Sequence, residues 1–373
     1  MTIAEERADC KFRSIASALR QRGEALALVD SGVNSRVDSE EPNRWRTASR
    51  LCRRYVGVSL DELYDTRVER TPYGSCLHLV DRVAPFELGL AGPDLAEDTI
   101  LSELRLVFGV GPVTAEAMRV AGVRRVSELV GHRRFGGSAA WLVQCWERQD
   151  LVSLHDHIRQ RLGGAGHGLG LLLAGLVPPE RVVVVDLETL GLWGAPIVLF
   201  GFARVERGCL EIHQYLARAG SEEPAALWLA LKVLGGCDVM VTYNGRSADS
   251  PWMRQRLAYF GFGRASTPVH LDLLHPVRRR YRGGAGSGDP ATGGSGPAAS
   301  LLDCRLATVE SNLLGIERSV DDLPGDAVPH FYREYERRQN VGPLIPIIDH
   351  NRADLVAVGR LLSHLGSDAA ARW

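Results

Sequence analysis

Lysine is almost absent from this 373-residue chain, which has only Lys11 and Lys232, so arginine supplies nearly all of the positive charge. The formal net charge of −1 excludes a global positive field, and any binding of a polyanion must come from local patches. Guanidinium groups suit phosphate oxygens. A GC-rich genome explains the same bias together with the abundant glycine, and we favour that explanation.

Paired cysteines and long apolar segments are also missing. The seven cysteines are odd in number and never spaced as C-x-x-C, which argues against a disulfide framework and against a zinc site. The first ten residues carry acids and no apolar stretch, so they do not resemble a signal peptide. The apolar run Gly168–Val177 is too short to span a bilayer. We therefore expect a soluble cytoplasmic protein with no membrane association.

The chain is long enough for two or three domains, and its texture changes twice. Residues 1–70 combine an amphipathic start (Phe12–Leu19), a polar break and an arginine-rich stretch, and predict no function. Residues 71–177 have strand-like alternation near Ser75–Val83 and then helical periodicity, which predicts a mainly helical domain.

Residues 178–373 have the pattern of an α/β domain. Four consecutive valines, Val182–Val185, are typical of a strand that is buried on both faces. The pattern predicts a mixed sheet flanked by helices. Its gly- and ser-rich stretch over residues 283–300 predicts a flexible insertion. Further strands are expected at 197–205, 211–216 and 239–243, and helices at 224–234, 251–259 and 349–365.

Two acids, Asp186 and Glu188, follow the valine run at positions i and i+2. A strand period of two places both carboxyl groups on one face of the sheet. Neighbouring carboxylates at the end of an apolar strand repel each other unless a cation neutralises them, and Mg²⁺ or Mn²⁺ prefers such oxygen ligands. Alone, the pattern equally fits two solvated acids.

Two later segments add acids. Asp249 follows the turn Asn244-Gly245, where it fits either a site residue or an ordinary helix cap. His350 and Asp354 lie four residues apart on the predicted last helix and therefore share one face. A simple surface salt bridge between them is the alternative.

The order of these motifs resembles the YprB-type branch of the ribonuclease H-like exonucleases, the DEDD or DnaQ-like class. The resemblance spans residues 181–365, about half of the chain. It is carried by five ordered stretches, VVVVDLETLGL, VTYNGRSADSPWMRQR, HLDLLHPVRRRYR, LDCRLATVESNLLGIERSVDDLPG and IIDHNRADLVAV.

The resemblance implies that Asp186, Glu188, Asp249 and Asp354 bind two Mg²⁺ or Mn²⁺ ions and that His350 is the general base. It also implies that Thr189 and Asn244 contact the nucleic acid. The chain departs from the common pattern in two ways. It lacks a second threonine after Thr189, and His350 precedes Asp354 by four residues instead of five. Asp349 has the spacing of five, but we prefer His350 because another acid would crowd the site with charge.

Arginines follow the third stretch. Arg278 and Arg279 belong to a basic run that predicts either a solvated face or part of the path of a phosphate backbone. The preceding Asp272 is expected to have a structural role.

A second module is suggested by Gly109-Val110-Gly111, which lies between two segments of helical periodicity. It resembles a helix-hairpin-helix motif, in which phosphate approaches backbone N–H groups at a helix N-terminus. Arg119, Arg124 and Arg125 follow the motif and would bind the backbone without reading sequence. An ordinary pair of packed helices is the alternative.

These features predict a hydrolase, a 3′→5′ exonuclease that degrades DNA to nucleoside monophosphates, with DNA repair as an association. A structure-specific endonuclease or an RNA-trimming exonuclease could use the same centre. A catalytically silent DNA-binding adaptor is the alternative from another class. The expected partner is nucleic acid, preferably DNA, and a helicase or repair protein is a further association.

Overall fold

The computed structural model describes residues 41–164, 167–263, 268–281, 301–318 and 322–372, and within these ranges it contains one seven-stranded sheet. The strand order is β1-β2-β5-β4-β3-β6-β7. The strands are β1 (Asp65–Thr71), β2 (Gly74–Val83), β3 (Val182–Thr189), β4 (Ile197–Glu206), β5 (Cys209–Leu216), β6 (Val239–Thr242) and β7 (Val269–Asp272).

The sheet is mixed. In sheet order, β1, β2, β5, β4 and β3 pair antiparallel with one another. Strand β6 pairs parallel with β3, and β7 pairs parallel with β6. The carboxyl ends of β3, β6 and β7 therefore meet at one edge of the sheet. This arrangement confirms the predicted α/β class with a mixed sheet flanked by helices and sets the place where the acidic residues can approach one another.

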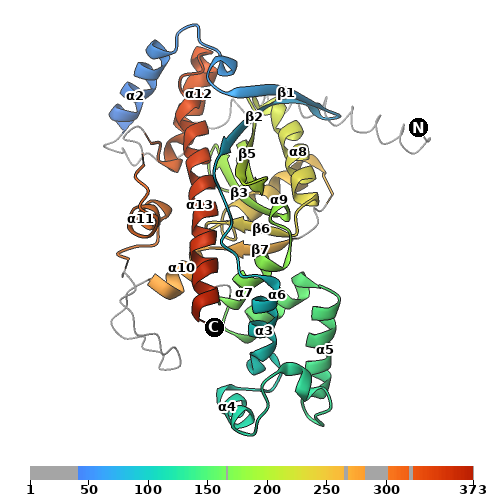
Figure 1. Cartoon of the computed structure of the whole chain (residues 1–373). Helices are drawn as coiled ribbons and strands as arrows, with labels where there is room; N and C mark the ends of the chain where they lie inside the picture. The colour runs from blue at the N-terminus through green and yellow to red at the C-terminus, as the bar shows by residue number, and fades with distance from the viewer. Residues whose placement is uncertain (1–40, 165–166, 264–267, 282–300, 319–321, 373) are drawn as a thin grey trace, which may run out of the picture.

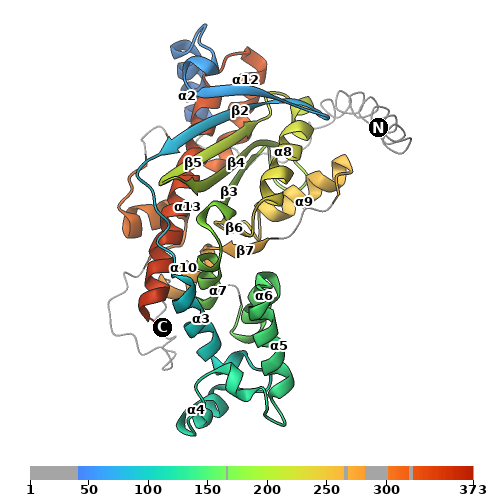
Figure 2. The ribbon, with the colours of Figure 1, turned by 45° about the vertical axis from the view of Figure 1, so that its right-hand side comes forward.

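Helices cover both faces of the sheet, and a separate helical region lies beyond its β7 edge (Figures 1 and 2). Figure 2 shows α13 on one side of the strands and α8 with α9 on the other. None of the helices in the described ranges is long and apolar enough to cross a membrane. The helices are α2 (Glu41–Arg54), α3 (Pro93–Ser102), α4 (Pro112–Val120), α5 (Gly136–Glu147), α6 (Leu151–Arg161), α7 (Leu169–Leu172), α8 (Glu223–Gly235), α9 (Asp249–Phe260), α10 (Leu274–Tyr281), α11 (Leu306–Val309), α12 (Val328–Arg338) and α13 (Leu344–Arg372).

The valine run of β3 separates two hydrophobic cores. Val183 and Val185 pack with α8 and α9, whereas Val182 and Val184 belong to the core that contains the buried face of α13. All four valines are buried, as expected for a strand covered on both sides. Because side chains alternate, the positions that follow Val184 in steps of two face α13.

The strand expected near Ser75–Val83 is present as β2, but it belongs to the sheet and not to the helical domain to which the sequence analysis assigned it. We expected residues 71–177 to form a mainly helical domain after a separate segment 1–70, but β2 pairs with β5 along residues 77–83 and so extends the sheet. The helical region thus begins at α3. Local alternation predicts the strand near Ser75–Val83 but not its partner, which is set by tertiary contacts.

Other elements agree with the expected pattern or lengthen it. The helical periodicity from residue 94 to residue 162 corresponds to α3, α4, α5 and α6. Strand β3 continues four residues beyond the valine run, and α13 begins five residues before the expected 349. The amphipathic start Phe12–Leu19 and the insertion 283–300 lie outside the described residues.

Helix α13 packs tightly against the sheet at Gly201 of β4. In the pairing register, Gly201 lies between Asp186 of β3 and Gln214 of β5. Asn351 of α13 is fully buried over it, and a Cβ atom at position 201 would lie 2.2 Å from the Asn351 Oδ1. The absence of a side chain at Gly201 is therefore what lets Asn351 lie on the sheet.

Gly201→Ala is expected to lower the free energy of unfolding by about 1–3 kcal/mol, because the added methyl group overlaps Asn351 in a packed core. Urea denaturation measures this change. Gly220→Ala is the matched control: no atom lies within 4 Å of its added Cβ, so a change within about 0.5 kcal/mol is expected. Equal stability of the two variants would contradict the proposed packing.

Candidate active site

Asp186 and Glu188 lie on the face of β3 that is turned toward α13. Glu188 is buried, and Asp186 is held by Asn351, whose Nδ2 donates to the Asp186 Oδ2 over 2.7 Å. Gln214 in turn donates to the Asn351 Oδ1 over 2.8 Å and to the Ile348 carbonyl over 2.9 Å. A buried chain of amides thus fixes the carboxyl group of Asp186 against the sheet.

Asp249 is the first residue of α9, and it is buried. The N-cap position belongs to Ala248, and no side-chain capping bond is present there, so simple capping does not explain Asp249. The loop before it is shaped by Asp272, whose carboxylate accepts the backbone N–H groups of Asn244 (2.8 Å) and Arg246 (3.0 Å). Asp272 therefore has the structural role that the sequence suggested.

His350 and Asp354 lie on one face of α13, with the His350 Nε2 3.8 Å from the Asp354 Oδ2. Asp349 is turned elsewhere and accepts a hydrogen bond from the Tyr64 hydroxyl over 3.0 Å. This supports the choice of His350 over Asp349. The helix period predicted the pair correctly, because residues four apart are neighbours on a helix surface.

The four acids act on one another electrostatically. Burial, followed by the charges of Asp354, Glu188 and Asp249, raises the pKa of Asp186 well above its usual range. Burial and the surrounding acids raise the pKa of Glu188 to about 8, although His350 opposes this shift. Burial is also the main cause that raises the pKa of Asp249 to about 7. The folded chain thus concentrates negative charge at the end of β3.

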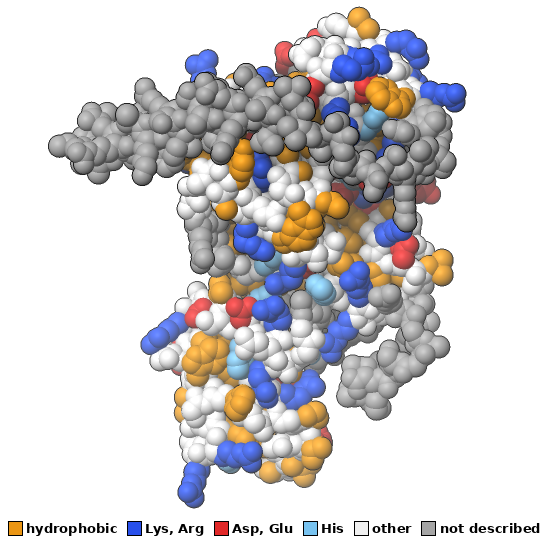
Figure 3. Space-filling model, turned by 180° about the vertical axis from the view of Figure 1, so that it is seen from behind, with side chains coloured by type: hydrophobic (Ala, Val, Ile, Leu, Met, Phe, Trp, Pro, Cys, Tyr) orange, Lys and Arg blue, Asp and Glu red, His pale blue; other side chains and the backbone are white. Residues whose placement is uncertain are grey.

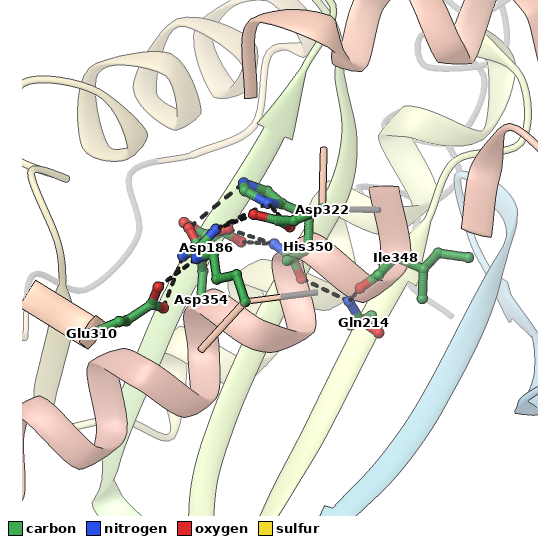
Figure 4. Close-up of polar contacts among 9 residues, drawn as sticks. Asp186, Gln214, Glu310, Asp322, Ile348, His350 and Asp354 are labelled. Atoms are coloured by element: carbon green, nitrogen blue, oxygen red, sulfur yellow. Dashed lines mark hydrogen bonds and ion pairs between the residues drawn. The ribbon is translucent and has the colours of Figure 1, made fainter. Parts of the chain in front are cut away.

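A second group of charged residues, which the sequence analysis missed, surrounds His350 and Asp354 (Figure 4). Arg318 donates to the Asp354 Oδ1 over 2.5 Å and to the Asp322 Oδ2 over 2.9 Å. The buried Glu310 accepts hydrogen bonds from both the Nε and the Nη2 of the same guanidinium. The Asp322 Oδ1 lies 2.9 Å from the His350 Nδ1. No periodic pattern links these residues in the sequence.

His350 differs from the expected general base in its charge. Burial lowers its pKa, but the hydrogen bond to Asp322 and the charges of Asp354 and Glu188 outweigh burial and raise the pKa to about 9. The imidazole is therefore protonated at neutral pH when the acids around it are not compensated. It can accept a proton only where positive charge offsets those acids.

The side chains fit a divalent cation by chemistry, although they do not already converge. In the ranges described above, no three His, Cys, Asp or Glu side chains are close enough to form a ready metal centre. The donors are nevertheless hard carboxylate oxygens, the ligands that Mg²⁺ and Mn²⁺ prefer. Two of them, Glu188 and Asp249, are buried with raised pKa values, which is the state that a bound cation would relieve.

Four of the residues expected to contact nucleic acid lie on or next to β3, β6 and α10. Thr189 ends β3, and its hydroxyl donates to the Gly191 carbonyl over 2.7 Å. Asn244 is exposed, and its left-handed backbone (φ 65°) makes the turn after β6. Arg278 and Arg279 are exposed on α10. Their contacts to nucleic acid stay a prediction.

The helical region contains the glycine turn that was expected. Gly109 has φ +85°, and Gly111 is the N-cap residue of α4. Arg161 braces the turn by donating to the carbonyls of Arg105, Val107 and Val110 at 3.0–3.2 Å.

The three arginines of this module are not equally available. Arg119 lies within 4 Å of the carboxylates of Glu103 and Glu116, and Arg125 pairs with Asp98 over 2.7 Å. Neighbouring acids thus offset the charge of these two arginines. Arg124 is exposed.

A basic surface that the sequence did not reveal lies where the helical region meets the sheet. Arg and His side chains gather there on the face shown in Figure 3. We call the surface around His155, Arg159, Arg246 and His270 the basic waist. Burial and the charge of Arg246 lower the pKa of both His155, on α6, and His270, on β7, to about 4 and about 3. Burial and the charge of Arg159 likewise lower the pKa of Arg246. These neighbouring basic groups create a local positive field.

A cavity of about 180 Å³ lies apart from the acids. Val183 of β3 and Val233 of α8 line it together with His78 and His213. Val183 faces α8, whereas Asp186 and Glu188 face α13, so the cavity and the acids are on opposite faces of the sheet. The acidic cluster, and not this cavity, is the candidate active site.

Comparison with known proteins agrees with the fold. Residues 183–366 match the family model described as the RNase_H superfamily. No curated protein matches the chain in sequence. Among solved structures, the chain is similar to the family B DNA polymerase from the hyperthermophilic archaeon Pyrobaculum calidifontis, with 16% identity and a TM-score of 0.37. That similarity covers 52% of this chain and 27% of the polymerase chain.

The raised pKa of Glu188 predicts how stability depends on pH in a chelator. Its pKa is about 8 in the folded chain and 4.5 ordinarily, so between these values the folded chain binds more protons than the unfolded one. The free energy of unfolding should therefore fall as pH rises from about 4.5 to about 8. Glu188→Gln removes the charge and should exceed the wild type in stability at pH 8 but not at pH 4.

Urea denaturation in EDTA at several pH values measures this difference. Glu180→Gln is the control, because Glu180 is an exposed acid just before the same strand. A wild type that is as stable as Glu188→Gln at pH 8 would show that Glu188 is not held in a repulsive site.

Proposed function

We propose that this protein is a metal-dependent nuclease that hydrolyses phosphodiester bonds. The observation that carries the proposal is that Asp186 and Glu188 of β3 and Asp249 of α9 all lie within electrostatic reach of Asp354 on α13. Burial first, and then the charges of neighbouring acids, raise the pKa of Asp186, Glu188 and Asp249. Strongly perturbed carboxyl groups beside one another are a mark of functional sites. The match to the RNase_H superfamily supports the same class of chemistry.

The four acids would hold two Mg²⁺ or Mn²⁺ ions. When bound, such ions stabilise the entering and leaving oxygens of an in-line displacement at phosphorus. The chain's own groups supply the rest of the arrangement. Asn351 keeps Asp186 against the sheet, and Asp322 orients the ring of His350 through Nδ1, which leaves Nε2 on the side of the acids. His350 is the group that we assign to proton transfer with the attacking water.

DNA is the proposed substrate, and cleavage is proposed to proceed from the 3′ end to nucleoside monophosphates. The support is the glycine turn before α4, where backbone N–H groups at a helix N-terminus suit phosphate, and the basic waist between the two regions. Contacts of both kinds go to the backbone, so binding should be independent of sequence and sensitive to salt.

Asp186→Asn is expected to lower the rate at which end-labelled DNA is degraded with Mn²⁺ by more than about 100-fold. Mutating a residue that only supports a metal ligand typically lowers metal affinity or activity by about 10–100-fold, and this change removes a proposed ligand itself. A gel assay with and without EDTA measures the rate. Asp94→Asn, an exposed acid on α3, should leave the rate unchanged. Degradation that survives either EDTA or Asp186→Asn would refute the proposed chemistry.

The role of the glycine turn is tested by charge at Gly111. This residue has ordinary backbone angles and open space at its Cβ, so a longer side chain fits. Gly111→Glu should weaken binding of duplex DNA by about 10-fold relative to Gly111→Gln, because only the carboxylate repels phosphate there. Fluorescence anisotropy at low salt measures the two affinities. Equal affinities would assign DNA binding to another surface.

A further inference from the structure

We infer that Arg318 is a positioning residue of the acidic site: anchored by Glu310, its guanidinium orients Asp354 toward the other acids. The inference rests on the proposed function, because it gives Asp354 the role of a metal ligand.

The first observation is that the N–H groups of Arg318 are already used. A guanidinium has five N–H donors. Arg318 places two of them on Glu310, one on Asp354 and one on Asp322. The remaining Nη1 donor lies 3.2 Å from the His350 Nδ1, inside the same cluster. Carboxylates therefore accept four of the five N–H donors of Arg318, which separates it from an arginine that binds substrate.

The second observation concerns its anchor. Glu310 is 1% exposed and accepts the guanidinium through both carboxylate oxygens. A planar fork held at two points has a fixed orientation. Glu310 begins a π-helical turn, Glu310–Leu314, a rare local geometry that is found often at functional sites. The fork is thus fixed by a buried residue that is not one of the four acids.

The third observation is that Arg318 bonds only one of the two carboxylate oxygens of Asp354. The Oδ1 accepts from Arg318 over 2.5 Å, whereas the Oδ2 is the oxygen nearer to the His350 Nε2, at 3.8 Å. Arg318 thus occupies one oxygen and leaves the other toward the cluster. Asp322 plays the same part for the ring of His350, since it accepts from Arg318 through one oxygen and contacts the His350 Nδ1 through the other.

Removing Arg318 alone would not test positioning, because it would also leave Glu310 without its partner and add negative charge near the cation. The double variant Arg318→Met/Glu310→Gln removes one positive and one negative charge together. We expect it to bind Mn²⁺ about 10-fold more weakly than the wild type, as for other residues that orient metal ligands. Its nuclease rate at saturating Mn²⁺ should fall as well.

Mn²⁺ affinity is measured on the full chain from the electron paramagnetic resonance signal of free Mn²⁺. Arg337→Met/Glu334→Gln is the matched control, because Glu334 is buried and accepts Arg337 over 2.8 Å on α12. It should bind Mn²⁺ like the wild type. Unchanged or tighter binding by the Arg318 double variant would overturn the inference, and tighter binding would identify Arg318 as a competitor of the cation.

Arg318→Lys keeps the charge and replaces the fork by a point charge. It should fold like the wild type, which thermal unfolding monitored by circular dichroism can verify, and bind Mn²⁺ about 3- to 10-fold more weakly. Full affinity in this variant would show that charge alone suffices and would reject positioning. Asp186→Asn separates the two proposals. If this variant binds Mn²⁺ as the wild type does, the proposed metal site itself is wrong. If it loses Mn²⁺ binding while the Arg318 double variant binds normally, only the role of Arg318 is rejected.

Discussion

Burial is the main cause that raises the pKa values of Asp186, Glu188 and Asp249, and the charge of Asp354 adds to the shift of each of them. Asp186 is held by a neutral amide, since the Asn351 Nδ2 donates to its Oδ2. Buried like charges without a partner are costly, and they persist only where the surrounding fold over-determines them. The rest of the site is best understood as the structure that maintains this repulsion.

Two hydrogen-bonding networks hold the acids in place. On the sheet, Gly201 leaves room for Asn351, which links Gln214 of β5 to Asp186 of β3. In the second network, Arg318 is anchored by Glu310 and compensates Asp354. A guanidinium thus compensates Asp354, whereas the pKa values of Asp186, Glu188 and Asp249 stay raised. A divalent cation would complete the proposed site because it would supply positive charge beside the three buried acids.

Part of this site could be read from the sequence, because it depends on local periodicity. A strand period aims Asp186 and Glu188 to one face, and a helix period pairs His350 with Asp354. Asp249 needed the order of motifs, since an aspartate that begins a helix has a simpler explanation. Arg318 and Glu310 could not be found in this way: they are joined across a π-helical turn by an ion pair, and their partners on α13 are far along the chain. Strand β2 was assigned to the helical domain for a related reason, since its pairing with β5 depends on tertiary contacts.

The central claim is that the acidic cluster holds divalent cations, and a crystal structure of the protein with Mn²⁺ tests it most directly. The account predicts anomalous density for Mn²⁺ among the carboxylates of Asp186, Glu188, Asp249 and Asp354, with the Asp354 Oδ2 turned to the metal and Oδ1 still on Arg318. Crystals in which Mn²⁺ is absent from these carboxylates at millimolar concentration, while the four side chains remain as described, would contradict it.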